Sequence, residues 1–206
     1  NAAIFDNDYT DIQINQFEAG TGGASSRIVN AGAGTYRGVE FDIVAVPFEG
    51  LTLDLSYGYL DAEFDEYLAR NPVTNQLDDI SDRTTVGQAP ESTASLGLQY
   101  DFVPFSFGSL STRLDVAYKD EFVFHPINNQ YDSTDPRTLV NGRISLDEIR
   151  MGCCSDRNAL RVSLWGRNLT DEEYRNWGID FGTLGFAGVT YGEPRTYGLD
   201  VVYTYR

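Results

Sequence analysis

Hydrophobic and polar side chains alternate with a period of two along much of this chain, most regularly over residues 51–59 (LTLDLSYGY). Successive side chains of a β-strand point to opposite faces of a sheet, so this segment is predicted to be a strand with two unlike faces. One face would carry Leu51, Leu53, Leu55, Tyr57 and Tyr59, and the other Thr52, Asp54, Ser56 and Gly58.

The same alternation recurs along the chain and predicts an all-β, antiparallel fold. Residues 3–17 also look extended, although the parity slips between Tyr9 and Ile12, as a β-bulge would cause. This gives about eight strands, each close to the roughly 9–11 residues that a tilted membrane-spanning strand needs. Segments 94–102 and 197–206 repeat the strong pattern, and weaker versions occupy 39–45, 112–119, 139–146 and 160–167.

The connections between these segments alternate in length, which favours a membrane barrel over a soluble one. Short turns on one side and long loops on the other are typical of outer-membrane barrels. A soluble sandwich or lipocalin-like barrel also alternates, but it gives no reason for Tyr to cluster toward strand ends. Short turns are expected at 47–50, 103–109 and 150–158, and longer polar loops at 18–27, 68–88, 125–136 and 178–188.

Composition narrows the class of protein further. Lys and Arg number 15 against 31 for Asp and Glu, and the net charge of −16 disfavours nucleic-acid binding. Taken alone, this acidity would suggest a soluble, well-hydrated surface. No apolar run reaches the roughly 18 residues of a transmembrane helix. The only cysteines, Cys153 and Cys154, are adjacent and have no histidine nearby, so a zinc site is not expected.

Four stretches, in order, resemble the C-terminal half of TonB-dependent receptors. The clearest are WGRNLTDEEY (165–174), similar to that family's penultimate-strand motif, and YGEPRTYGLDVVYTYR (191–206), similar to its closing strand. Upstream, residues 30–64 (NAGAGTYRGVEF…LDAEF) resemble a longer run of motifs in the family, and residues 90–102 (PESTASLGLQYDF) resemble one of its strands. The family usually ends on an aromatic residue, whereas this chain ends Tyr205-Arg206, so one further aromatic residue is expected after it.

The resemblance implies an architecture and partners. Residues 1–206 would be the C-terminal segment of a receptor β-barrel of about 22 strands, with the N-terminal plug domain absent and sheet edges exposed at the first and last strands. The location would be the outer membrane of a Gram-negative bacterium, in contact with outer-membrane lipid. The partners would be the plug domain and, through it, the TonB energy-coupling system.

Candidate site residues follow from the alternation. No catalytic, cofactor or metal site is expected, since His125 is the only histidine and no GxSxG occurs. The acidic residues between Asp61 and Asp82 are either simply solvated or close to divalent cations at the cell surface. Lumen-facing positions are predicted for Arg113, Lys119, Arg143, Arg161 and Arg167. Membrane-interface positions are predicted for Tyr57, Tyr59, Tyr100, Phe102, Trp165, Tyr203 and Tyr205.

Two functions remain open. The first is energy-coupled uptake of a large scarce solute: siderophore-bound iron, haem, cobalamin or an oligosaccharide. The second is an autonomous small outer-membrane barrel with a surface-binding or structural role. An outer-membrane hydrolase is a more distant third, which the single histidine disfavours.

Overall fold

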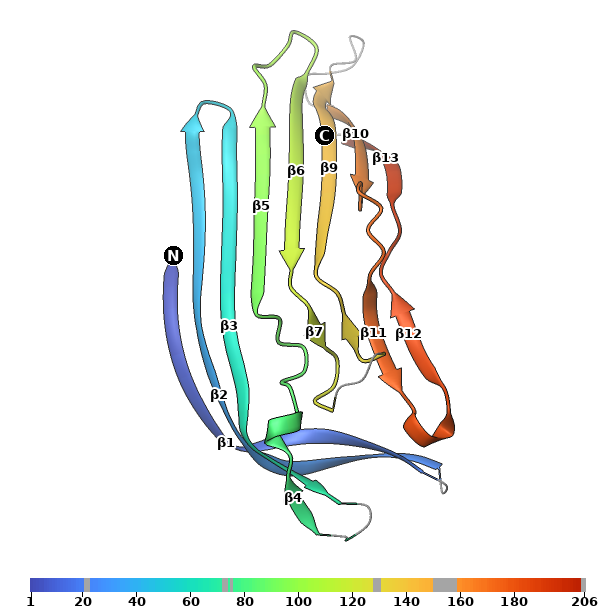
Figure 1. Ribbon diagram of the computed structural model, residues 1–206. Helices are drawn as coiled ribbons and strands as arrows, with labels where there is room; N and C mark the ends of the chain where they lie inside the picture. Colours follow the sequence, from blue (N-terminus) through green and yellow to red (C-terminus); the bar gives the residue numbers. More distant parts are fainter. Residues whose placement is uncertain (21–22, 72–73, 75, 128–130, 150–158, 205–206) are drawn as a thin grey trace.

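An antiparallel β-sheet dominates the computed structural model, which describes residues 1–20, 23–71, 74, 76–127, 131–149 and 159–204. Eight strands lie side by side in the order β1-β2-β3-β5-β6-β9-β10-β13, as Figure 1 shows, and the short β4 pairs with the far end of β3. The strands are β1 (Ala2–Gly20), β2 (Gly23–Phe48), β3 (Leu51–Arg70), β4 (Leu77–Asp79), β5 (Ser92–Asp101), β6 (Ser109–Lys119), β9 (Arg137–Ile149), β10 (Ala159–Arg167) and β13 (Thr196–Thr204).

The predicted fold class is confirmed, because each strongly alternating segment forms a strand of this path. The register aligns apolar side chains into rows that cross the sheet, including Ile43, Leu55, Leu96, Val116 and Val140 on five consecutive strands. We call the side that carries this row the apolar face and the opposite side the polar face. On the polar face, Ser56 and Ser95 of neighbouring strands share a 2.6 Å hydrogen bond.

The two ends of the sheet differ as the connection lengths predict. One end, the turn end, carries the short connections 49–50 and 102–108. The other, the loop end, carries the long connections and lies at the bottom of Figure 1. The predicted turn at 150–158 lies outside the described residues. The loop end holds two small β-ribbons and two short 3₁₀ helices: β7 (Phe122–Val123) with β8 (Ser133–Thr134), β11 (Arg175–Asp180) with β12 (Ala187–Tyr191), η1 (Ser81–Arg83) and η2 (Gly182–Leu184).

The prediction of a loop at 18–27 was wrong. Strands β1 and β2 continue through this segment as a paired ribbon up to Gly20 and Gly23. Strand pairing depends on backbone hydrogen bonds, which form without any alternation of apolar and polar side chains. This Gly- and Ser-rich segment shows no such alternation, so its strands could not be predicted from the sequence. The predicted bulge is confirmed, since the β1–β2 register shifts between Tyr9 and Ile12.

Beyond this bulge the β1–β2 ribbon bends away from the sheet and crosses the loop end, as Figure 1 shows, so that β1 contacts η2. The bend coincides with a small apolar cluster in which Tyr67, 1% exposed, packs against Ile12 and Phe64. Gly32 is required here: it has a positive φ of 151°, and a Cβ atom would collide with the backbone carbonyl of Glu66.

Burial is concentrated at the loop end and not between the long strands. Among the described residues the buried apolar side chains are Tyr67, Val86, Val123 and Phe124, all of which belong to the loop end. The apolar face is open, with Leu164, Leu199 and Val201 each 60% exposed. An extended apolar surface of this kind needs a partner medium or molecule to cover it. None of the described helices is long and apolar enough to cross a membrane.

Candidate functional site

The polar face gathers the charged side chains of the sheet. Register and alternation place all five cations predicted to face the lumen on this one face. Arg113 of β6 and Arg143 of β9 are direct cross-strand neighbours, and Arg143 in turn lies opposite Trp165 of β10. Lys119, Arg161 and Arg167 share the parity of these residues along their own strands.

Arg113 is held by carboxylates on two strands. Its guanidinium lies 3.1 Å from Asp54 of β3 and 2.8 Å from Asp115 of its own strand. To reach Asp54 it crosses Gly97 of β5, where a Cβ atom would lie only 2.6 Å from the Nη2 atom of Arg113. Glycine at this position therefore makes room for an ion pair that spans three strands.

A second network joins β9, β10 and β13. Arg143 lies 3.0 Å from Asp200, and the indole N–H of Trp165 donates to the other oxygen of that carboxylate at 3.1 Å. The Trp165 ring covers Gly198 so closely that a Cβ atom there would collide with it. Trp165 thus lies on the polar face, opposite the face of the other aromatic candidates, and its placement does not support the expected role as an interface anchor.

Further pairs complete the polar face. Arg161 pairs with Asp147, and the Arg167 guanidinium lies 3.9 Å from Glu193 between two exposed side chains. Ser145 and the fully buried Ser163 share a 2.8 Å hydrogen bond between β9 and β10. Each of these four arginines therefore has a carboxylate close by, so this part of the polar face can border water or polar protein without isolated charges.

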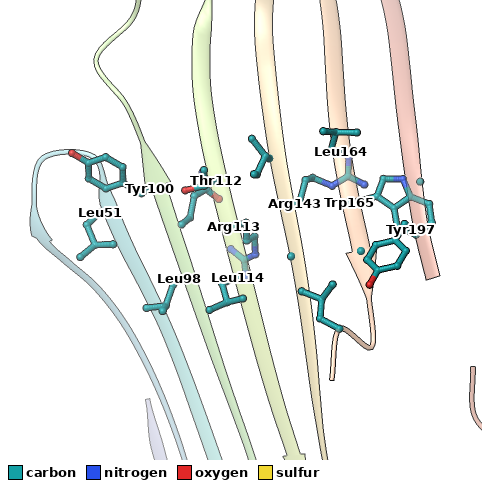
Figure 2. A pocket seen from close by; sticks show the side chains of 16 residues that line it. Leu51, Leu98, Tyr100, Thr112, Arg113, Leu114, Arg143, Leu164, Trp165 and Tyr197 are labelled. Carbon is teal, nitrogen blue, oxygen red and sulfur yellow. The ribbon is translucent and has the colours of Figure 1, made fainter. Parts of the chain in front are cut away.

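The apolar face carries a shallow groove of about 610 Å³, shown in Figure 2. Gly142 and Gly166 are cross-strand partners within it, and Leu169 packs onto both. Large side chains from β3 to β13 line the groove, among them Leu51, Leu98, Tyr100, Leu114, Leu164 and Tyr197. Thr112 and the polar-face residues Gln99, Arg113, Arg143 and Trp165 also border the groove.

Four aromatic candidates, Tyr57, Tyr59, Tyr100 and Tyr203, share the parity of the apolar face. Phe102 follows the last residue of β5, and its ring meets that of Tyr100 edge-on, with 4.6 Å between centroids. Tyr205 lies outside the described residues. Tyr100, Phe102 and Tyr203 lie near strand ends, where amphipathic rings suit a boundary between an apolar medium and water, whereas Tyr57 and Tyr59 lie within β3.

The acidic residues between Asp61 and Asp82 partly organise their own loop. The Asp79 carboxylate accepts hydrogen bonds of 3.0 Å from the backbone N–H groups of both Tyr67 and Ser81, and these bonds lower the pKa of Asp79. In the same loop the Asn71 amide donates to Asp78 at 2.8 Å. Within the described residues no group of three or more His, Cys, Asp or Glu side chains is arranged to hold a metal ion.

His125 lies where the loop-end ribbons meet. Its ring contacts Trp177 edge-on, with centroids 6.1 Å apart. Asp132 is nearby and only 4% exposed, and burial raises the pKa of its carboxyl while the charge interaction with His125 acts against this rise. The described residues place no serine or cysteine nucleophile in hydrogen-bond contact with His125. Its position is therefore that of a packing residue between loops.

A sheet with an exposed apolar face, an ion-paired polar face, short turns at one end and long loops at the other is a segment of transmembrane β-barrel wall. Residues 1–169 match the sequence model of the family described as "TonB dependent receptor-like, beta-barrel". The chain belongs to this family, whose members are outer-membrane receptors and transporters of Gram-negative bacteria and not enzymes.

Three solved receptors are similar to nearly the whole chain. The ferric yersiniabactin uptake receptor FyuA from Yersinia pestis matches 99% of this chain with a TM-score of 0.70 and 20% identity. The siderophore receptor PiuA from Acinetobacter baumannii matches 97% with a TM-score of 0.67 and 17% identity. The ferric preacinetobactin receptor BauA from Acinetobacter baumannii matches 98% with a TM-score of 0.63 and 20% identity.

The chain spans only 27%, 25% and 26% of the lengths of FyuA, PiuA and BauA, respectively. At these identities the similarity shows the shared fold alone.

Proposed function

We propose that residues 1–206 form the C-terminal segment of the barrel wall of an outer-membrane receptor that imports a large scarce solute. The observation that carries the proposal is the contrast between the two faces of one sheet. The apolar face, with Leu164 and Leu199 each 60% exposed, suits the hydrocarbon of a bilayer. The polar face, with its neutralised arginines, suits the interior of a barrel that holds a plug domain and water.

Energy would reach this wall through partners outside the chain. In this proposal the plug domain fills the lumen beside the polar face, and the TonB system acts on the plug. The wall supplies a rigid frame and carries the long connections of the loop end on the cell surface. Those connections differ in sequence among barrels of one fold, so solute specificity would lie in them.

A ferric siderophore is the favoured solute among the four classes considered. Support comes from FyuA, PiuA and BauA, which are named as receptors for a ferric siderophore or a siderophore. Haem uptake is less favoured because His125, the single histidine, packs between loops. An oligosaccharide is less favoured because none of these three receptors is named for a sugar.

Uptake of iron by the complete receptor tests the proposal. A strain that lacks its own siderophore receptors would express the complete gene and receive radiolabelled iron as a panel of siderophore complexes. We expect accumulation of at least one complex, and loss of that accumulation when TonB is deleted. Accumulation that persists without TonB, or no accumulation of any complex, would overturn the proposal.

A folding experiment separates the receptor from an autonomous small barrel. Residues 1–206 would be refolded alone in detergent and run on a gel with and without heating. A receptor segment should give no compact, heat-modifiable monomer, because the β1 and β13 edges have one paired neighbour each in the described sheet. A heat-modifiable folded monomer would favour the small barrel.

A further inference from the structure

Two cations face each other across neighbouring strands at the loop end of the polar face. Lys119 is the last residue of β6, Arg137 is the first residue of β9, and the two are register partners. Like charges directly opposite each other in a sheet are destabilising unless something compensates them. Both side chains are only partly buried.

The comparison with Arg113 and Arg143 shows what is unusual about this pair. Those two arginines are also register partners, but each has a carboxylate close by: Asp54 at 3.1 Å for Arg113 and Asp200 at 3.0 Å for Arg143. Among the described residues, no carboxylate oxygen lies within 4.0 Å of the charged nitrogens of Lys119 or Arg137. In a chain of net charge −16, this lack of acidic partners is notable.

Aromatic rings take the place of carboxylates around the pair. The Lys119 ammonium lies 4.8 Å from the ring centroid of Phe122, and the Arg137 guanidinium lies 5.8 Å from the same ring. Arg137 also stacks on Tyr174, with 4.4 Å between its Cζ atom and the ring centroid. Rings attract cations without neutralising them, so the charges remain available to an anion.

The position of Arg137 is fixed before any ligand arrives. Its Nη1 atom donates to the backbone oxygen of Arg175 at 3.2 Å, which orients the guanidinium plane. The Tyr174 ring beneath it covers Gly192, where a Cβ atom would collide with the ring. A site whose groups are already oriented loses less entropy on binding.

We infer that Lys119 and Arg137 form a subsite for an anionic oxygen group of the imported solute, such as a carboxylate or a catecholate. The inference rests on the proposed function and narrows its solute class to complexes that carry negative charge. An ammonium and a guanidinium on adjacent strands can donate charge-assisted hydrogen bonds to neighbouring oxygens of one group. Phe122 and Tyr174 would flank the flat, apolar part of the same molecule.

Nearby carboxylates limit the attraction of Lys119 and Arg137 for anions to short range. Phe122 also borders a cavity of about 520 Å³ whose lining includes Glu91, Asp120 and Glu121. These carboxylates oppose the approach of a diffuse negative charge. The pair therefore selects an anionic group that makes direct contact with both cations.

Binding of two iron complexes to the complete receptor in detergent tests the inference. The probes are a strongly anionic ferric tris-catecholate and a neutral ferric tris-hydroxamate, with binding followed by quenching of tryptophan fluorescence. The variants are Lys119→Gln, Arg137→Gln and the double variant. Arg83→Gln, which removes an exposed cation from η1 elsewhere at the loop end, is the matched control.

We expect the unmodified receptor to prefer the tris-catecholate and each single variant to weaken its binding about tenfold, or about 1.4 kcal/mol. The Arg83 variant should bind both probes as the unmodified receptor does. Equal affinity for both probes, or an unchanged tris-catecholate affinity in the double variant, would overturn the inference. A double variant that weakens both probes alike and lowers the unfolding temperature would also overturn it, because the pair would then serve the receptor's own fold.

The uptake experiment above distinguishes failure of the subsite inference from failure of the proposed function. If TonB-dependent accumulation of some complex occurs but the double variant leaves tris-catecholate binding unchanged, the subsite is wrong and the function stands. If no complex accumulates, the proposed function itself fails.

Discussion

Arg113 of β6 and Asp54 of β3 form a 3.1 Å ion pair across the strand that separates them. The pair exists because Gly97 of the intervening β5 has no side chain to block it. It links β3 and β6 through side chains across β5, in addition to the backbone hydrogen bonds between neighbouring strands. Its partly exposed position means that the free energy it contributes is modest, about 0.2–1 kcal/mol.

Replacing Gly97 with alanine tests this role of the glycine. The new Cβ atom would lie 2.6 Å from Arg113 Nη2 and 3.1 Å from Asp54 Oδ2, and would push the pair apart. Gly58→Ala is the control on the same face, because its Cβ atom would meet only the Thr93 hydroxyl at 3.2 Å and Glu40 Cγ at 3.9 Å. Gly-to-Ala changes at open positions usually stabilise, so Gly97→Ala should be less stable than Gly58→Ala by about 1 kcal/mol.

Urea unfolding of both variants of the complete receptor in detergent measures this difference. A double variant with Asp54→Asn should lose most of the effect of Gly97→Ala, because the pair is then already broken. Equal stabilities for Gly97→Ala and Gly58→Ala would show that the pair does not depend on the glycine.

The Trp165 hydrogen bond to Asp200 gives a second prediction. Trp165→Phe keeps a ring over Gly198 but removes the indole N–H that donates to the carboxylate at 3.1 Å. Hydrogen bonds to charged groups are stronger than those between neutral groups, so the free energy of unfolding should fall measurably. Trp177→Phe, at a 41% exposed position in β11, should change it by less than about 0.5 kcal/mol. Similar losses for the two variants would contradict the assignment of Trp165 to the ion-pair network.

Acidification should loosen the loop that Asp79 organises. The backbone N–H groups of Tyr67 and Ser81 lower the pKa of Asp79 in the folded loop, so the unfolded loop binds the proton more readily. The contribution of Asp79 is therefore complete above its ordinary pKa of about 4, and it is lost as the pH falls through the lower folded value.

Amide hydrogen exchange of Tyr67 and Ser81, corrected for intrinsic rates, measures this loosening. Protection should decrease below about pH 4, and Asp79→Asn should decrease it already at neutral pH. The control Asp82→Asn removes an exposed carboxylate paired with Arg83 at 3.5 Å, and it should leave the protection of both amides unchanged. Protection that stays constant from pH 7 to pH 3 would contradict the role of Asp79.

The bend in the β1–β2 ribbon depends on Gly32. Gly32→Ala adds a Cβ atom against the Glu66 carbonyl at a positive φ of 151°, which should cost about 1–3 kcal/mol and displace the ribbon from η2. Gly188→Ala, where the nearest atom would be Ile179 Cγ2 at 3.8 Å, is the control. The distance between spin labels at Ser25 and Leu184 should lengthen in the Gly32 variant only. An unchanged distance would show that the bend is set elsewhere.

Much of the sheet could be predicted because its faces meet different surroundings. Where one face is apolar, as along Leu51, Leu53 and Leu55, the period of two appears directly in the sequence. The part of the β1–β2 ribbon at 18–20 and 23–27 was missed because it lacks such a pattern. The short strands β4 and β8 fall in segments expected to be loops, since strands of two or three residues leave too little pattern to read.

The candidate sites were predictable only in part, because contacts between distant residues depend on register. Alternation placed Lys119 on the polar face, but nothing in the sequence joins it to Arg137, which begins a strand 18 residues later. Trp165 was assigned to the membrane interface from its residue type, although its parity matches that of Arg161 and Arg167. Parity was the stronger signal, because a strand residue cannot change faces without a bulge.

The solvent exposure of alternate residues along β5 tests the central claim most directly. Spin labels would be placed singly at Ser95, Leu96, Leu98 and Gln99 of the complete receptor in bilayers, and their collision rates with oxygen and with a water-soluble nickel complex measured. Labels at Leu96 and Leu98 should meet oxygen, which concentrates in hydrocarbon, and labels at Ser95 and Gln99 should not. Equal contact of all four labels with the nickel complex would contradict a membrane-spanning wall.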